Sequence, residues 1–206
     1  MKNILSIDHQ DPDNETVNRA AESLKADNLI VAPTETRYGL LGRADSHIVV
    51  EKLYNLKNRP KSMPTALFVK SIDDILKFAV LNEIALKLAN KYLPGPLTLV
   101  LQADCELPSP IVVDNKIGIR YSSSPFIKML LERFDFPVTA TSANLYRADE
   151  SDNIDEIFSF FGDKIDLYIN VGELTNDVST VVDLSENKIK LLRSGAITEN
   201  EIMEII

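Results

Sequence analysis

The spacing of apolar residues along the chain divides it into alternating helices and strands. Val17, Ala20 and Leu24 recur at three- and four-residue spacing, which predicts an amphipathic helix over residues 14–28. The apolar run LIVA that follows at 29–32 is typical of a short buried strand. The same patterns predict further helices over 46–58, 83–92, 125–134 and 155–161, with short helices after Ser71 and from Glu199. They predict further strands over 66–69, 97–102, 117–121, 136–141, 167–171, 179–184 and 189–192.

The order of these elements indicates the fold class. Helices and strands alternate early and strands cluster late, which favours an α/β open sheet of mixed strand direction over a purely doubly wound sheet. No internal repeat or Gly/Ser linker interrupts the chain, so we expect a single domain over residues 1–206. The sequence holds neither G-x-G-x-x-G nor a Walker P-loop, so any nucleotide site must be built in another way.

Composition excludes several classes of protein. The single cysteine, Cys105, cannot form an internal disulfide, and two histidines, His9 and His47, are too few for a cysteine/histidine zinc site. No apolar run approaches the roughly 18 residues of a membrane span, and the N-terminal residues turn polar too early for a signal peptide. We therefore expect a cytoplasmic protein with no membrane partner and no metal held by its own side chains.

The net charge of −9 argues against a polyanionic partner, but the charge is unevenly distributed. Residues 1–148 hold 18 basic and 17 acidic residues, whereas residues 149–206 hold 4 basic and 14 acidic residues. Basic residues gather between positions 37 and 70, where the acidic residues are Asp45 and Glu51. The basic residues are Arg37, Arg43, Lys52, Lys57, Arg59, Lys61 and Lys70. This segment could face an anion.

The segment PTETRYGLLGR, residues 33–43, follows the first predicted helix and strand. Ligands of open α/β sheets tend to bind at the carboxyl ends of strands, and this segment offers two threonine hydroxyls, a carboxylate, an arginine and a tyrosine. The alternative is a polar turn in which Thr34 and Thr36 make local backbone bonds and Gly39 and Gly42 adopt positive φ. The pattern alone leaves both interpretations open.

The segment LKNRPKSMP closes the helix that follows. Lys57 and Arg59 stand at a helix C-terminus, where the macrodipole already favours cations, so their placement alone decides nothing. Pro60 stiffens the turn, however, so Lys57, Arg59 and Lys61 would project from a fixed point and could hold a phosphate chain.

Polar residues also end three later strands. In TATSAN, Ser142 and Asn144 alternate in extended backbone, so both side chains point to one side, where they bind a ligand or build a turn. Arg120 in IGIRY and Arg193 in LLRSG each end an apolar strand, so each either reaches solvent or reaches into a cleft.

Taken in order, the segments LIVAPTET, LKNRP, LPGPLTLVL, IGIRY, TATSAN, STVVDL and LLRSGAI resemble the YrdC-like family, which includes threonylcarbamoyl-AMP synthases. The resemblance covers nearly the whole chain. It implies a mixed, twisted α/β open sheet flanked by helices around a concave cavity. It also implies condensation of L-threonine, bicarbonate and ATP into threonylcarbamoyl-AMP with release of pyrophosphate, a step toward threonylcarbamoyladenosine in tRNA.

The resemblance assigns the ATP site residue by residue. Lys57 and Arg59 match the K-x-R motif of the family and would act as catalytic residues that hold the triphosphate and the pyrophosphate leaving group. Ser142 and Asn144 match the S-x-N motif at the nucleotide, and Arg193 of the L-R-x-G segment would return to the nucleotide.

The resemblance likewise assigns the threonine site and the partners. Thr36 of P-T-x-T would contact threonine, Arg120 of G-x-R would pair with its carboxylate, and Ser179 of STVVD would complete the pocket. Nucleotidyl transfer would require Mg²⁺ bound with ATP, held largely by phosphate oxygens. A downstream tRNA threonylcarbamoyl transferase would take the product, and contact with tRNA itself would be weak.

Five residues depart from the usual pattern of the family. Tyr146 and Arg147 stand where a Ser-Gly pair is common, Phe68 replaces a frequent histidine, and Met63 replaces a frequent asparagine. Arg37 occupies a position that is usually apolar, where it would add a cation beside the phosphates. These departures concern the nucleotide and threonine contacts, so they bear on substrate choice.

Two alternatives stay open beside the synthase. One is a YciO-like paralogue, or a carbamoyl-transfer module like that of hydrogenase maturation factors. Such YciO-like paralogues tend to lose the K-x-R lysine and the S-x-N asparagine, which this chain keeps as Lys57 and Asn144. The other alternative is an RNA-binding module of the same fold, which the net charge of −9 disfavours.

Overall fold

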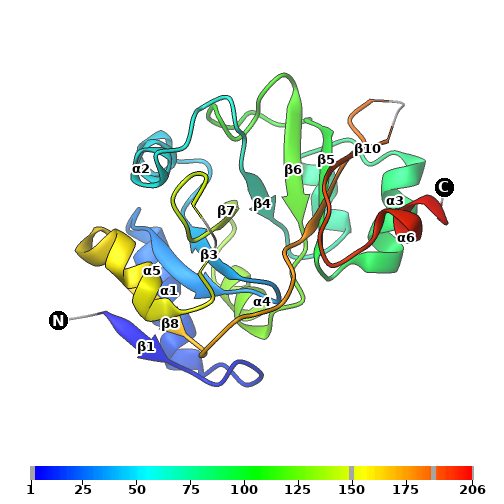
Figure 1. Ribbon diagram of the computed structural model, residues 1–206. Coiled ribbons are helices and arrows are strands. Elements are labelled where there is room, and N and C mark those ends of the chain that lie inside the picture. The colour runs from blue at the N-terminus through cyan, green and yellow to red at the C-terminus, as the bar shows by residue number, and fades with distance from the viewer. Residues whose placement is uncertain (1–2, 149–150, 187–188, 206) are drawn as a thin grey trace.

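Figure 1 shows the protein as a computed structural model, which describes residues 3–148, 151–186 and 189–205. In these residues ten strands form one sheet: β1 (Ile4–Ser6), β2 (Ile30–Pro33), β3 (Tyr38–Leu41), β4 (Ala66–Phe68), β5 (Leu97–Gln102), β6 (Lys116–Arg120), β7 (Val138–Ser142), β8 (Leu167–Asn170), β9 (Thr180–Asp183) and β10 (Lys190–Arg193). The helices are α1 (Asn14–Lys25), α2 (His47–Lys57), α3 (Glu83–Tyr92), α4 (Pro125–Leu131), α5 (Ile154–Phe161) and α6 (Glu199–Met203), with 3₁₀ turns η1 (Asp73–Lys77) and η2 (Gly162–Lys164). The predicted α/β class is confirmed.

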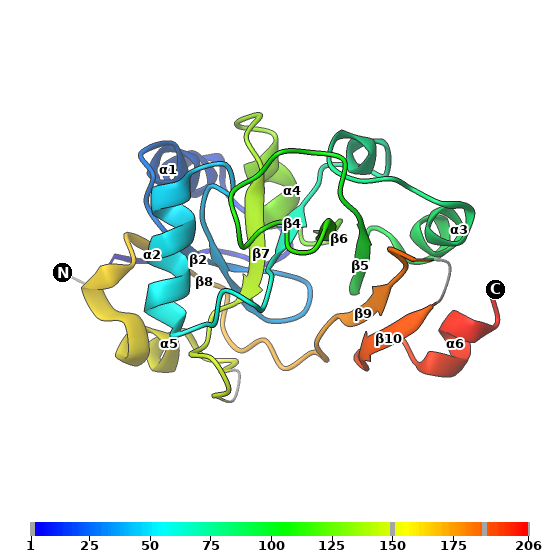
Figure 2. The same cartoon turned by 90° about the horizontal axis from the view of Figure 1, so that it is seen from above.

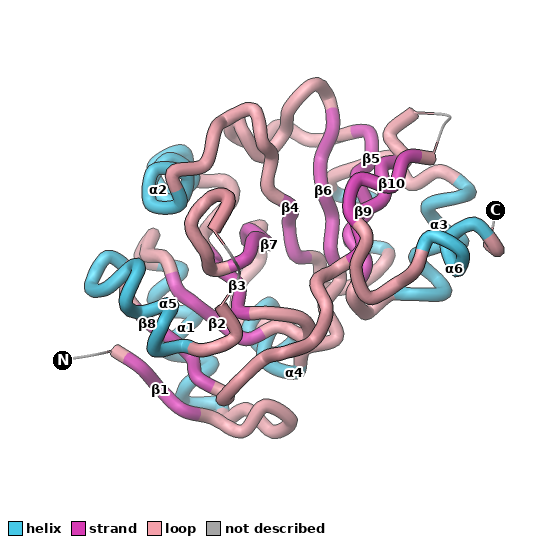
Figure 3. The backbone as a smooth tube through the Cα atoms, viewed as in Figure 1, coloured by secondary structure: helices cyan, strands magenta, loops and turns pink. Residues whose placement is uncertain are grey.

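The strand order in the sheet is β1-β8-β2-β3-β7-β4-β6-β5-β9-β10. Strand β2 pairs parallel with β8 but antiparallel with β3, and β4 pairs parallel with β6 but antiparallel with β7. The sheet is therefore mixed, as expected, and its strands turn steadily from β8 to β5 in the twist visible in Figures 1 and 2. Because β8 and β9 lie near opposite ends of the sheet, the loop 171–179 that joins them runs past the strands between them (Figure 3).

Apolar side chains pack against both faces of the sheet. Along β2, Ile30 and Val31 belong to two different buried clusters, because successive side chains of a strand point to opposite faces. Helices α1 and α4 cover one face, where Leu24 and Leu130 join the cluster of Ile30. Helices α2, α3 and α5 contribute to the other cluster, which includes Leu53. Packing on both faces fixes the strands that carry the polar residues described below.

Side-chain caps explain where several helices begin. The hydroxyl of Ser46 accepts a hydrogen bond from the first turn of α2, as the sequence predicts. Ser124 does the same for α4, where Pro125 occupies the first turn. Ser71 also accepts a backbone hydrogen bond, but the element that follows is the 3₁₀ turn η1 and not an α-helix.

Two helices are shorter than predicted. Helix α1 ends at Lys25, and Asp27 adopts a left-handed φ of 59° before β2 begins. Helix α4 ends at Leu131. Within the described part of the chain, no helix is both long enough and apolar enough to cross a membrane.

The structure corrects the interpretation of residues 33–43 as one loop. Tyr38–Leu41 form strand β3, which is buried along its whole length and pairs with β2 across a tight turn. Strand β1 was also not predicted, because Ile4–Ser6 is too short to show a period and is placed by pairing with β8.

The glycines of this segment have a different role from the expected one. Gly39 and Gly42 do not adopt positive φ; in the described residues Gly162 and Gly172 do. A Cβ on Gly42 would lie 2.6 Å from Leu29 Cδ2 and 2.6 Å from Val49 Cγ1. Close packing of the strand ends therefore requires glycine at position 42.

Candidate active site

A cavity of about 440 Å³ lies along one face of the adjacent strands β3, β7, β4, β6, β5 and β9. This volume is in the range of small-molecule sites, about 300–1,000 Å³. Gly118, Ala66 and Ala140 are direct register neighbours on β6, β4 and β7, and all three line the cavity. No side chain larger than a methyl group therefore stands in the middle of its floor. This row of small residues provides the space for a ligand.

The lining of the cavity is strongly basic. Among the described lining residues none is acidic, and the basic ones are Arg37, Arg59, Lys116, Arg120 and Arg193. The described residues also contain no group of three His, Cys, Asp or Glu side chains that could hold a metal ion. Carboxylates outside the lining offset part of this charge, since Glu35 pairs with Arg120 and both Asp183 and Glu186 pair with Lys116. The guanidinium groups on the wall still favour an anionic ligand over a cationic one.

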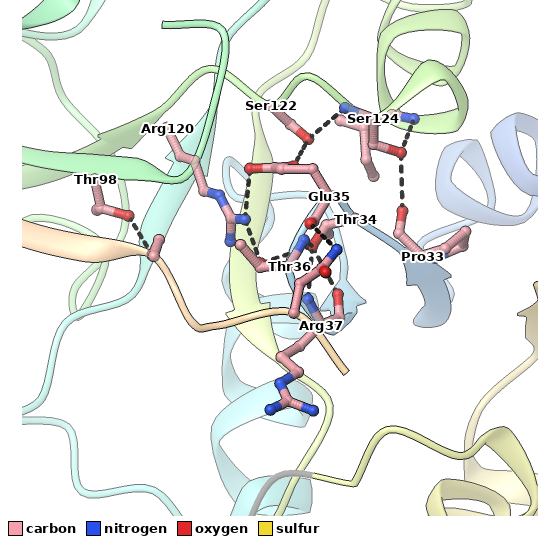
Figure 4. Close-up of polar contacts among 12 residues, drawn as sticks. Pro33, Thr34, Glu35, Thr36, Arg37, Thr98, Arg120, Ser122 and Ser124 are labelled. Carbon is pink, nitrogen blue, oxygen red and sulfur yellow. Dashed lines mark hydrogen bonds and ion pairs between the residues drawn. The ribbon is translucent and has the colours of Figure 1, made fainter. Parts of the chain in front are cut away.

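The turn between β2 and β3 is built around the hydroxyl of Thr34. This hydroxyl donates to the carbonyl oxygen of Arg37 at 2.7 Å and accepts from the backbone N–H groups of Thr36 and Arg37 at 3.1 and 3.2 Å. The hydroxyl of Thr36 lies 3.0 Å from that of Thr34, and both side chains are buried. The interpretation as a polar turn is confirmed for Thr34, whereas the hydroxyl of Thr36 accepts from Arg120 (Figure 4). Ligand binding by this segment stays a prediction.

Arg120, at the end of β6, is held by groups on this turn. Its Nη2 donates to Glu35 Oε1 at 2.7 Å and to Thr36 Oγ1 at 2.5 Å, and the Ser122 hydroxyl donates to the other oxygen of Glu35. The side chains of Arg120 and Glu35 are each 12% exposed, so water screens their attraction only in part. The ring of Phe68 lies 5.6 Å from the guanidinium carbon. Arg120 Nε is buried and has no hydrogen-bond partner among the described residues.

A second cluster of hydroxyls lies beside Arg120. Thr98 on β5 is the register partner of Arg120, and its hydroxyl lies 3.0 Å from that of Ser179. Arg193 on β10 donates from Nε to the carbonyl oxygen of Ser179 at 2.9 Å and from Nη2 to its hydroxyl at 2.7 Å. The fold thus brings Thr36, Arg120 and Ser179 to the same end of the cavity, with Arg193 in contact with Ser179.

Lys57 joins two predicted motifs that lie 85 positions apart. Its Nζ donates to the carbonyl oxygen of Ser142 and to Asn144 Oδ1 at 3.2 Å, and the Ser142 hydroxyl donates to the same Asn144 oxygen at 2.6 Å. Ser142 and Asn144 therefore point to the same side, as their alternation predicts. The Lys57 side chain is only 1% exposed, so its ammonium is buried against the end of β7.

Arg59 lies on a loop that its own side chain closes. Nε and Nη2 donate to the carbonyl oxygens of Met63 and Pro64 at 2.9 and 2.8 Å. The hydroxyl of Tyr54 donates to the same Met63 oxygen at 2.9 Å, and burial raises the pKa of Tyr54 to about 12, so this donor keeps its proton at neutral pH. Arg59 and Met63 both line the cavity.

Sequence reasoning missed Glu35, Thr98 and Ser122. Glu35 stands inside the PTET segment, but its partner Arg120 is 85 positions away in the chain. Thr98 gave a usable signal, because a hydroxyl inside the apolar run LTLVLQ has to find a partner when it is buried.

The departures from the family pattern fall at different distances from the cavity. Met63, Phe68 and Arg37 line it. Tyr146 and Arg147 are not among its lining residues, and the Tyr146 N–H donates to the carbonyl oxygen of Lys57 at 2.8 Å. Tyr146 therefore ties the loop after β7 to the end of α2, and neither residue narrows the cavity.

Comparison with known proteins identifies the family. A family model for Sua5, YciO and YrdC, described by the words "telomere recombination", matches residues 22–195. A Methanocaldococcus jannaschii protein provisionally named threonylcarbamoyl-AMP synthase is 34% identical over 170 residues, which cover 82% of this chain and 80% of that protein.

Solved structures share the fold. Pyrococcus abyssi Sua5 in complex with L-threonine aligns with a TM-score of 0.92 and 29% identity over 98% of this chain. Escherichia coli YciO aligns with a TM-score of 0.89 and 25% identity over 98% of this chain. The chain spans 60% of the Sua5 chain and 100% of the YciO chain. By the matched family model and these likenesses, the chain belongs to the Sua5/YciO/YrdC family.

Proposed function

We propose that the protein is an L-threonylcarbamoyl-AMP synthase, a nucleotidyltransferase that condenses L-threonine, bicarbonate and ATP and releases pyrophosphate. The observation that carries the proposal is the cavity, whose described lining holds five basic residues and no acidic one in a chain of net charge −9. The name of the M. jannaschii relative and the threonine bound to P. abyssi Sua5 support it.

The proposed reaction needs no side-chain nucleophile. The amine of threonine adds to the carbon of bicarbonate with loss of water and forms a carbamate. A carbamate oxygen then attacks the α-phosphorus of ATP, and pyrophosphate leaves with the electron pair of the broken P–O bond. Threonine enters as a zwitterion, so its ammonium first loses a proton to solvent. The site has to position three reactants that each carry an anionic group and stabilise negative charge on the leaving group, which a basic cavity can do.

In this proposal the end of the cavity beside β5 and β6 takes the amino acid. Arg120 pairs with the threonine carboxylate through donors that Glu35 and Thr36 leave free. The hydroxyls of Thr36 and Ser179 then bind the polar groups around the substrate amine and hydroxyl. Hydrogen bonds fix one edge of the Arg120 guanidinium before the substrate arrives, so binding costs little further side-chain entropy.

The end beside β3 and β7 takes the nucleotide. Arg59 contacts the triphosphate, and Ser142 and Asn144 contact the nucleoside side. Lys57 contributes its charge from its buried place beside Ser142 and Asn144. Arg193 holds Ser179 at the amino-acid end, so its proposed contact with the nucleotide requires a nucleotide that extends across the cavity toward β10.

ATP enters as its Mg²⁺ complex, so the metal is part of the substrate. The described residues offer no carboxylate on the cavity wall, so phosphate oxygens and water would bind the ion. We further propose that a tRNA threonylcarbamoyl transferase takes up the product in the cytoplasm, with weak contact to tRNA itself.

A YciO-like activity is the second candidate. The observation in its favour is the likeness to E. coli YciO, which aligns with a TM-score of 0.89 and 25% identity. The two candidates differ in their need for threonine.

The deciding experiment measures pyrophosphate release from Mg·ATP by the purified protein, with threonine or bicarbonate omitted in turn. The synthase requires both. Release without threonine, or no release despite binding of ATP, would contradict the synthase and favour a paralogue.

Variants then test the site. Arg59→Ala should lose most turnover, because Arg59 lines the cavity, whereas Lys61→Ala should keep it, because the Lys61 side chain is 62% exposed and pairs with Glu51. Equal turnover in the two variants would contradict the assignment of Arg59.

A further inference from the structure

Arg37, at the end of the β2–β3 turn, lines the cavity but has no part in the site proposed above. It follows Thr36 in the chain, yet its side chain leaves the turn on the side away from Arg120 (Figure 4). The turn therefore holds the Arg120 guanidinium of β6 on one side and carries the Arg37 guanidinium on the other. A reaction between a carboxylate-bearing substrate and a polyphosphate needs two such positive centres that are held apart.

One edge of the Arg37 guanidinium is tethered and the rest is not. Nη1 donates to the carbonyl oxygen of Leu174 at 2.8 Å and lies 3.9 Å from Asp152 Oδ2. Nε is buried and has no hydrogen-bond partner among the described residues. Because Nε is closed off from solvent, a ligand would contact the exposed part of this side chain, which is 24% exposed and lines the cavity, and not Nε itself.

The backbone places Arg37 beside the S-x-N motif. Gly39 pairs with Ser142 in the antiparallel register of β3 and β7, and the carbonyl oxygen of Tyr38 accepts from the Ala143 N–H at 2.8 Å. Extending this register sets Arg37 opposite Asn144. Arg37 is thus next to the residues proposed to contact the nucleotide.

From these contacts we propose that Arg37 binds the triphosphate of the nucleotide. The inference rests on the proposed function and deepens it, because it gives the phosphate side of the cavity a cation that is independent of Lys57 and Arg59. The bond to Leu174 orients the guanidinium before the ligand arrives. Asp152, at 3.9 Å, is a loose counter-ion that the larger negative charge of a triphosphate displaces.

A purely structural role for Arg37 makes a different prediction. Its bond to Leu174 also fastens the loop 171–179, which leads to Ser179. Tyr38 fastens the same loop, since its hydroxyl donates to the Gly172 carbonyl oxygen at 2.6 Å and accepts from the Val171 N–H at 3.0 Å. Tyr38→Phe therefore loosens the loop without removing a charge, and it is the matched control for Arg37→Gln.

The test is calorimetric titration of the whole chain, as wild type, Arg37→Gln and Tyr38→Phe, with Mg·ATP, AMP and L-threonine. We expect Arg37→Gln to weaken binding of ATP about tenfold or more, as the loss of one charge-assisted hydrogen bond implies, and to change the affinities for AMP and threonine less than about threefold. Tyr38→Phe should bind ATP within about twofold of wild type.

Two outcomes would overturn the proposal: unchanged affinity of Arg37→Gln for ATP, or an equal loss of ATP affinity in both variants, which would assign the effect to the loop. Because binding is measured without turnover, the result is separate from the fate of the proposed function. A lack of threonine-dependent pyrophosphate release would refute the synthase but leave a role of Arg37 in ATP binding standing.

Discussion

The buried ammonium of Lys57 gives the sharpest test of the site as a folded structure. Lys57→Met keeps the length of the side chain but removes the donor to the Ser142 carbonyl oxygen and to Asn144 Oδ1. A hydrogen bond from a charged group contributes about 1.5–3 kcal/mol. Methionine avoids the cost of burying a charge, and the Ser142 hydroxyl still donates to Asn144, so we expect a net loss of about 2–3 kcal/mol in the free energy of unfolding.

The assay is urea unfolding followed by circular dichroism, with thermal unfolding as a second measurement. For a chain of about 200 residues, each kcal/mol lowers Tm by roughly 2–4 °C, so Lys57→Met should lower it by roughly 5–10 °C. Arg59→Met is the matched control. Its guanidinium bonds two loop carbonyls at a half-exposed position, and we expect a loss below about 1 kcal/mol.

Turnover separates the two roles of these residues. If both side chains act at the phosphates, both variants lose activity, but only Lys57→Met also loses stability. An unfolding free energy of Lys57→Met within about 0.5 kcal/mol of wild type would refute the view that its ammonium fixes the loop after β7. The prediction rests on the 1% exposure of Lys57, because water does not reach the ammonium and cannot replace the lost hydrogen bonds.

Three further predictions concern the neighbouring parts of the molecule. Glu35→Gln should lower the free energy of unfolding by about 2–4 kcal/mol, because it leaves Arg120 without its counter-charge in a largely buried place. In urea unfolding, the double variant with Arg120→Met should lose less than the sum of the two single variants, and strict additivity would contradict the coupling. Ala140→Ile should fill the cavity floor and abolish ATP binding in calorimetry while the Tm stays within about 5 °C; retained affinity would show that the ligand lies elsewhere. Burial raises the pKa of Asp183, but hydrogen bonds from Ser185 outweigh it, so the pKa lies below its usual value. Asp183 therefore stabilises the fold above about pH 4 and loses this effect as the pH falls through its lowered pKa, so Asp183→Asn should flatten the loss of stability in acid, and an unchanged pH profile would refute the shift.

The elements with a clear period could be predicted from the sequence. Strand β5 has its predicted bounds, Leu97–Gln102, and α3 begins and ends at Glu83 and Tyr92 as expected, because long apolar runs and a polar cap mark them. Strand β3 could not be found in this way. All four of its residues are buried, so it shows no alternation, and Gly39 lowers its strand propensity.

The contacts of the site were harder to predict than its residues. The pairing of Lys57 with Asn144 follows from the sheet order, which no local pattern specifies. The partnership of Glu35 with Arg120 depends on a turn that closes only once β3 pairs with β2. The row Gly118, Ala66 and Ala140, which makes room for the ligand, is visible only when the register is known.

The order of the strands also sets the order in which the two ends of the cavity can be completed during synthesis. Apart from Arg193, the residues proposed for the nucleotide lie between positions 37 and 144, so they leave the ribosome before β9 and β10 do, and strands β3 and β7 adjoin in the sheet. The amino-acid end waits for Ser179 and Arg193, because β9 joins β5 only after the loop from β8 has been made. In a nascent chain, the strands under the nucleotide end can therefore pair while the amino-acid end still lacks β9 and β10. Threonine affinity would then report the complete fold, since it depends on the last strands to be placed.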